Sequence, residues 1–107
     1  MSLDFSLTAK SGRVVFDRNI THNLTDMAEA AGIYNVLWRP TENGFIYGRD
    51  CVDVLRSGLE KLKNDPPKYE QYNAPNGWGL YEHFVPFVES VLEACEDFET
   101  AKVHACV

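Results

Sequence analysis

The feature that most constrains the fold is the spacing of hydrophobic residues, which alternate at both ends of the chain. Near the N-terminus, Leu3, Phe5 and Leu7 alternate with polar residues, which is typical of a strand with one buried face. A turn at residues 9–12 closes on a glycine, which accepts the positive φ that tight turns require. A second strand is expected over residues 13–17, so the pattern predicts an N-terminal β-hairpin.

The last seven residues repeat this alternation. Val103, Ala105 and Val107 alternate with Lys102, His104 and Cys106, and the spacing predicts a third strand over 101–107. An N-terminal hairpin and a C-terminal strand can together complete a three-stranded antiparallel sheet.

Between the predicted strands, apolar residues recur at the three- and four-residue spacing of helices. Thr21 is a predicted N-cap for the first helix, and Thr25 is a second candidate. Gly32 is expected to end this helix or interrupt it. A short helical turn follows over 33–37, and Pro40 stops it because the residue before a proline avoids helical geometry.

Two further helices are expected in the second half of the chain. Asp50 is the predicted cap of one, which ends at the Asn-Asp-Pro-Pro run of residues 64–67, with another helical turn possible over 67–72. The longest helix is expected over 80–96, where Pro86 should kink it or start its second half.

The resulting order is β-β-α-α-α-β, with about three helices. Helices gathered on one face of an antiparallel sheet give a small two-layer α+β domain. A chain of 107 residues is one domain in size, so residues 1–107 are expected to form a single unit.

Charge and cysteine content narrow the function classes. The net charge of −6 argues against general binding to a nucleic-acid backbone. Cys51, Cys95 and Cys106 lack Cys-x-x-Cys spacing, which favours free thiols in a reducing compartment over disulfides or zinc. We expect no cofactor, no metal and no membrane partner, and a cytoplasmic location. Cys51, near a predicted helix start, is a candidate for a lowered pKa.

Three short segments combine polar and aromatic residues at predicted breaks between regular elements, where a scaffold presents side chains to ligands. They are residues 21–24, 37–40 and 73–79. The predicted ligand-binding residues are His22, Asn23, Trp38, Arg39, Asn76 and Trp78.

The first two segments offer hydrogen-bonding and stacking groups. The imidazole of His22 and the amide of Asn23 can each donate and accept hydrogen bonds, although both residues also suit capping or bracing a helix end. Trp38 offers a stacking face and Arg39 a planar fork for phosphate or carboxylate, which suits a nucleotide-like ligand. The alternative is that Trp38 lies in the core and Arg39 pairs with a nearby acid such as Glu42 or Asp50.

The third segment, Asn76-Gly77-Trp78-Gly79, precedes the last predicted helix. Backbone N–H groups at a helix start bind anions, and glycine permits close approach. The alternative is a turn that packs Trp78 as a lid on the core.

These segments carry a family resemblance. The chain resembles a group of small phage and prophage proteins of unassigned function in a spaced run of short segments. These segments are residues 20–24, 27–28, 31–34, 37–40, 58–59, 76–79 and 94–95. The resemblance covers roughly residues 20–107. It implies a phage or prophage origin and a setting inside a bacterial host cell, and it brings no reaction and no catalytic residues.

Three functional hypotheses follow. The first is a non-catalytic accessory protein that binds a small polar or nucleotide-like ligand at the predicted residues. The second is a protein that binds a host protein through an acidic and aromatic surface formed by residues 93–99, Tyr69 and Tyr72. The third is a small hydrolase or transferase that uses His22. No nucleophile–base pair stands at motif spacing in the sequence, so a non-enzymatic role is preferred, and the oligomeric state is left open.

Overall fold

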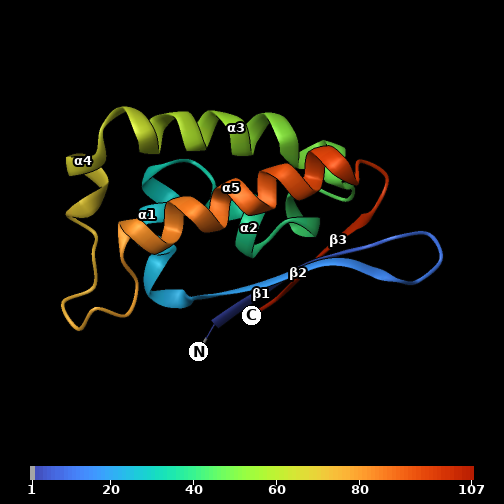
Figure 1. Ribbon diagram of the computed structural model, residues 1–107, viewed down its shortest axis with the longest axis horizontal. Coiled ribbons are helices and arrows are strands. Elements are labelled where there is room, and N and C mark those ends of the chain that lie inside the picture. The colour runs from blue at the N-terminus through green and yellow to red at the C-terminus, as the bar shows by residue number, and fades with distance from the viewer. Residues whose placement is uncertain (1) are drawn as a thin grey trace.

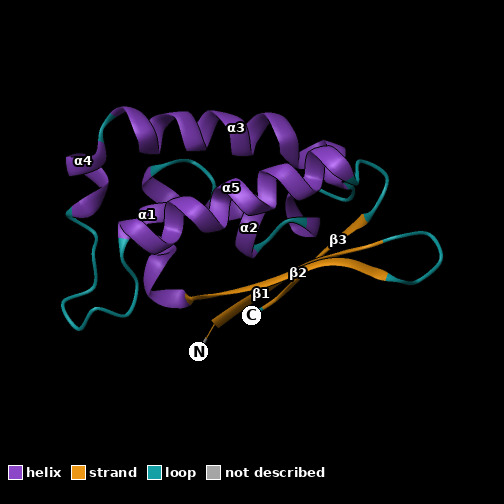
Figure 2. Ribbon diagram, viewed as in Figure 1, coloured by secondary structure: helices purple, strands orange, loops and turns teal. Residues whose placement is uncertain are grey.

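The chain folds into two layers, with a three-stranded antiparallel sheet on one side and helices on the other (Figures 1 and 2). The computed structural model describes residues 2–107. The strands are β1 (Ser2–Thr8), β2 (Val14–Thr21) and β3 (Lys102–Cys106), in the spatial order β2-β1-β3. This arrangement confirms the predicted small α+β fold, with the hairpin and the C-terminal strand in one sheet.

Seven helical elements lie between β2 and β3. They are η1 (His22–Leu24), α1 (Thr25–Ala30), α2 (Tyr34–Trp38), η2 (Thr41–Asn43), α3 (Gly48–Asn64), α4 (Pro66–Glu70) and α5 (Tyr81–Asp97). The long helices α3 and α5 contribute buried residues to the same core as the inner face of the sheet. No helix in residues 2–107 combines the length and the apolar character that crossing a bilayer requires.

The alternating N-terminal pattern sets the two faces of the sheet. Leu3, Phe5 and Leu7 are fully buried against the helices, while the residues between them lie on the open face. β2 runs to Thr21, four residues beyond the predicted end, because Ile20 pairs with Leu3 and is also buried. The helix-facing side of the sheet is therefore longer than the alternation alone indicated.

Local signals place most helix ends correctly. The Thr21 hydroxyl accepts a hydrogen bond from the Asn23 N–H (3.2 Å) and caps η1. Gly32, with φ of +77°, follows α1. The helix α3 begins at Gly48, so the prediction of Asp50 as its cap is wrong, because Tyr47 is the N-cap and Asp50 lies in the first turn. The Asp50 carboxylate accepts hydrogen bonds from the two backbone N–H groups that precede the helix.

The helix α5 continues through Pro86 without interruption. It contains 17 residues, as does α3, so it is not longer than α3 as expected from the sequence. The two helices approach closely at the N-terminus of α3. A Cβ atom added to Gly48 would lie 2.5 Å from the Phe98 carbonyl oxygen. Only glycine permits this approach.

Candidate ligand-binding site

A groove of about 650 Å³ opens where the hairpin meets the first helical turn and the loop before α5. We call it the Asn23 groove. It is lined by Ser2, Asn19, Thr21, His22, Asn23, Asn76 and Trp78. Four of the six predicted ligand-binding residues are thus brought together from two segments about fifty residues apart in sequence.

Hydrogen bonds hold the two walls of the groove to each other. The Asn23 side-chain amide donates to the Trp78 carbonyl oxygen at 2.6 Å. Within the loop, the Asn76 side-chain oxygen accepts the Trp78 N–H at 3.0 Å. The Asn23 side chain therefore braces the loop before α5 and does not cap a helix, and it also lines the groove.

Gly79 is the point of closest contact between the walls. Its φ is +119°, a value that residues with a side chain rarely adopt. A Cβ atom at this position would lie 2.8 Å from the Asn23 Cβ and 3.3 Å from the Thr21 Cγ2. The loop can rest on the 21–23 segment only because residue 79 has no side chain.

The indole of Trp78 stands open to solvent. It is 72% exposed, the most exposed of the large hydrophobic side chains in residues 2–107. The alternative in which Trp78 closes over the core is therefore wrong. A large flat ring held at the rim of a groove offers a stacking surface.

Trp38 lies in the core, as the alternative interpretation of the sequence had it. It is 3% exposed and stacks on the Tyr34 ring, with centroids 5.7 Å apart and an interplanar angle of 5°. Its indole N–H donates to His22 Nδ1 at 2.8 Å. Because an indole N–H only donates, Nδ1 is the acceptor, and the hydrogen of the neutral imidazole ring lies on Nε2.

The hydrogen bond from Trp38 fixes the orientation of the His22 imidazole from its buried side. The imidazole is partly buried and also lines the groove. Trp38 thus supports the site without lining it.

Arg39 lies outside the Asn23 groove. Its guanidinium is 3.8 Å from the Glu42 carboxylate, and both side chains are largely exposed. Exposed pairs of this kind contribute little to stability. Glu42 is one of the two acids that the sequence offered as a partner for Arg39. With Arg39 elsewhere, no Lys or Arg is among the described residues that line the groove.

A second depression of about 450 Å³ adjoins the groove on the other side of Asn23 and Asn76. Asp26 and Tyr72 contribute to it, together with the loop residues Asn73, Ala74 and Pro75. The loop is tied to α5 by the Tyr81 N–H, which donates to the Asn73 side-chain oxygen at 2.7 Å. The two depressions share the Asn23–Asn76 pair as a common wall.

Sequence reasoning missed three residues of the groove, namely Ser2, Asn19 and Thr21. Ser2 pairs with Thr21 in the β1–β2 ladder, and the Asn19 amide donates to Ser2 Oγ and to Asp4 Oδ1, both at 2.8 Å. The missing information was the length of β2. Extending that strand to Thr21 brings the N-terminal residues beside the 21–23 segment.

Other residues singled out in the sequence have structural surroundings. The pKa of Cys51 is raised, first by a hydrogen bond with the Cys95 thiol and then by burial, so the expected lowering is wrong. Tyr69 is buried rather than exposed. In the part of the chain that the structure describes, no three His, Cys, Asp or Glu side chains are grouped to hold a metal ion.

Comparisons of the chain with models of protein families, with curated proteins and with solved structures find no match.

Proposed function

We propose that this protein is a non-catalytic accessory protein of phage or prophage type that binds a small polar, nucleoside-like ligand in the Asn23 groove. One observation carries the proposal. Polar and aromatic side chains singled out in two distant segments line a single groove, with an exposed indole at its rim. The phage setting and the cytoplasm of a bacterial host come from the sequence resemblance described above.

The groove offers both donors and acceptors that form no hydrogen bond with another described residue. Asn76 uses its side-chain oxygen within the loop, which leaves its NH₂ group for a ligand. Asn19 uses its NH₂ group on β1, which leaves its carbonyl oxygen. His22 adds the Nε2–H donor. An acceptor and two donors beside a stacking ring match the edge and face of a nucleobase.

The charge of the groove refines the ligand class. Among the residues that the structure describes, no Lys, Arg, Asp or Glu lines it, and Arg39, the predicted phosphate-binding fork, lies elsewhere. A phosphate group would find no cation in this groove. Nucleosides and free bases therefore suit it better than nucleotides do.

Fluorescence provides a direct test, because Trp78 is exposed and Trp38 is buried. The protein is titrated with nucleosides, bases and the corresponding nucleotides while tryptophan emission is followed, and affinities are measured by calorimetry. Trp78→Ala is expected to weaken binding by about 5- to 150-fold, as removal of one base-stacking aromatic does. The emission that remains in Trp78→Ala comes from Trp38, and its response to ligand should be small because the Trp38 ring is buried outside the groove.

Phe98→Ala is the matched control, since it removes another exposed aromatic ring from a different surface. Its affinity should equal that of the wild type. If no member of the panel binds, or if Trp78→Ala and Phe98→Ala bind equally well, the proposed function is wrong.

A second candidate function is favoured by the surface at the end of α5. Phe98 is 39% exposed and shares a depression with Glu96, Asp97 and Glu99. An apolar ring set among carboxylates suits a basic protein partner. Capture from a bacterial lysate that succeeds with the wild type and fails with Phe98→Ser would support it, whereas equal capture by both would contradict it.

A catalytic use of His22 has less support. Its Nδ1 is occupied by the buried indole of Trp38, so this nitrogen cannot be oriented by a carboxylate as in hydrolytic sites. If an activity were found, its survival in His22→Ala would exclude this role.

A further inference from the structure

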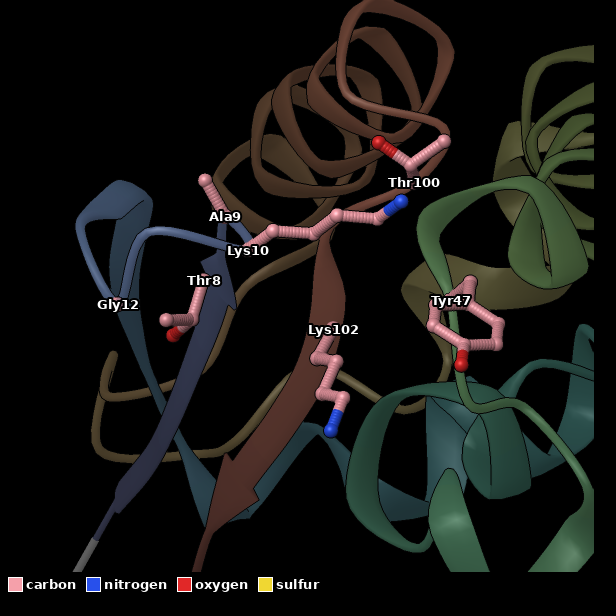
Figure 3. Close-up of a pocket in the computed structure, with 7 residues that line it drawn as sticks. All are labelled: Thr8, Ala9, Lys10, Gly12, Tyr47, Thr100 and Lys102. Atoms are coloured by element: carbon pink, nitrogen blue, oxygen red, sulfur yellow. The ribbon is translucent and has the colours of Figure 1, made fainter.

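We propose a second binding site, for a small organic anion, at the opposite end of the hairpin from the Asn23 groove. The site is a pocket of about 290 Å³, here called the hairpin-end pocket (Figure 3). It is lined by Thr8, Ala9, Lys10, Gly12, Tyr47, Thr100 and Lys102. The expected ligand carries a phosphate or carboxylate group on a compact flat or apolar body.

The β-sheet register builds one wall of the pocket. Thr8 pairs with Lys102 across β1 and β3, and Lys102 pairs on its other side with Tyr47. Side chains directly opposite each other in a sheet have Cβ atoms about 4.5–5.5 Å apart. Thr8, Lys102 and Tyr47 therefore form a row on one face at this end of the sheet, with a cation in the middle and an aromatic ring at one end.

The hairpin turn supplies the opposite side. Gly12 has a φ of +88°, and the Gly12 N–H donates to the Ala9 carbonyl oxygen at 2.9 Å, which fixes the turn. Figure 3 shows the Lys10 side chain reaching from this turn toward Thr100, with Lys102 and Tyr47 on other sides of the same space. Residues from three segments, 8–12, 47 and 100–102, thus line the pocket, with the Lys10 ammonium near Thr100 and the Lys102 ammonium directed away from Lys10.

The described residues that line the pocket include two lysines and no carboxylate, although the chain carries 16 acidic and 10 basic residues. Glu96, Asp97 and Glu99 line the adjoining depression, which shares Ala9 and Thr100 with the pocket. Within residues 2–107, neither Lys10 nor Lys102 has a carboxylate within 4.0 Å, whereas Arg39, Arg56 and Lys63 do.

A third cation strengthens the positive character. The Arg49 guanidinium lies over the Tyr47 ring, 4.8 Å from its centroid, and has no ion pair among the described residues. Cations without ion pairs among the described residues favour an anionic ligand.

Size and lining define the rest of the ligand. A volume of about 290 Å³ is close to the lower end of small-molecule pockets. The Tyr47 ring and the Ala9 and threonine methyl groups offer contact for an apolar body, and the lysines and hydroxyl groups offer donors to its acidic end. Such a ligand differs from the uncharged one proposed for the Asn23 groove, so the two proposals stand independently.

The test is an NMR titration of the ¹⁵N-labelled protein with phenyl phosphate, benzoate, inorganic phosphate and benzyl alcohol. We expect saturable shifts from the two aromatic anions at residues 8–12, 47 and 100–102. Inorganic phosphate should bind more weakly because it lacks the body, and benzyl alcohol should bind more weakly because it lacks the charge. Shifts at residues 76–78 would place the ligand in the other site.

Variants separate a defined site from general surface charge. Lys10→Gln and Lys102→Gln should each raise the Kd for phenyl phosphate by about fivefold, the upper range for a partly exposed charge pair. Arg13→Gln is the matched control, because Arg13 lies at the same hairpin end and outside the pocket lining. Its effect should stay below about twofold.

The proposal is overturned by any of three results. These are shifts that increase without saturation, an Arg13→Gln effect equal to that of Lys10→Gln, or tighter binding of benzyl alcohol than of benzoate. All three variants replace exposed residues, so the folded protein is available for each measurement.

Discussion

Gly79→Ala should open the Asn23 groove, and its cost can be worked out from the backbone. A φ of +119° lies where alanine is strained by about 1–3 kcal/mol. The new methyl group would also lie 2.8 Å from the Asn23 Cβ. Restricting the unfolded chain returns only about 0.4–1 kcal/mol. With backbone strain near the middle of its range and about 1–2 kcal/mol more for the overlap with Asn23, we expect a net loss of about 2–3 kcal/mol.

Gly77→Ala is the matched control for this change. Gly77 also has a positive φ, +78°, but a Cβ at this position would meet nothing within 4 Å. Its expected net loss is about 0.5–1 kcal/mol, from left-handed backbone strain less the gain from the unfolded state. The difference of about 2 kcal/mol between the variants reflects the contact of residue 79 with the 21–23 segment together with the different backbone strain at the two glycines.

Calorimetry and hydrogen exchange together provide the assay. For a domain of this size, 1 kcal/mol corresponds to about 4–8 °C in Tm, so Gly79→Ala should lower the Tm by about 10–20 °C and Gly77→Ala by a few degrees. If the loop detaches locally, the loss in Tm will be smaller, and faster exchange at residues 73–79 will reveal the opening. Equal Tm and equal exchange in the two variants would refute the reasoning.

Three further predictions concern the core. His22→Ala should cost about 1–3 kcal/mol in urea denaturation, because the buried Trp38 N–H loses its acceptor; no loss would contradict that role. Gly58→Ala should destabilise by about 1–3 kcal/mol despite the better helix propensity of alanine, since its Cβ would overlap the Ile33 side chain. A gain in stability would show that this contact is wrong. Folding keeps the Cys51 thiol protonated because its pKa is raised above the ordinary value near 9. Above about pH 9 the unfolded state therefore binds fewer protons, and stability should fall by up to about 1.4 kcal/mol per pH unit, a contribution that Cys51→Ala should remove.

The fold was largely predictable because its signals are local. Alternation at Leu3, Phe5 and Leu7 identified β1 as a strand with one buried face, and the glycines in the hairpin turn and after α1 marked chain reversals. The end of β2 was missed because residues 17–19 are polar and exposed, which hides the pairing of Ile20 with Leu3. β2 extends to Thr21 because it pairs with β1 there, and the local sequence of β2 does not reveal that pairing.

The two tryptophans show what sequence cannot decide about a site. Trp38 follows Tyr34 at helical spacing and lies in the core, whereas Trp78 stands between two glycines and is exposed. From the sequence alone, each tryptophan could lie either in the core or at a binding surface, and only the tertiary contacts distinguish the two. Lys10 and Lys102 gave no signal at all, because only the β1–β3 pairing brings residues from the two ends of the chain to one pocket.

The position of β1 has a consequence for how the chain folds. β1 is the central strand, and its second partner is β3, so that Asp4 pairs with Cys106 about one hundred residues later. Contacts so distant in sequence slow folding, because the entropy of closing a long loop is lost before the pairing stabilises the sheet. During synthesis β1 and β2 emerge before β3, so one edge of β1 stays open until β3 is also available. The pairing of the five-residue β3 with β1 therefore completes the sheet.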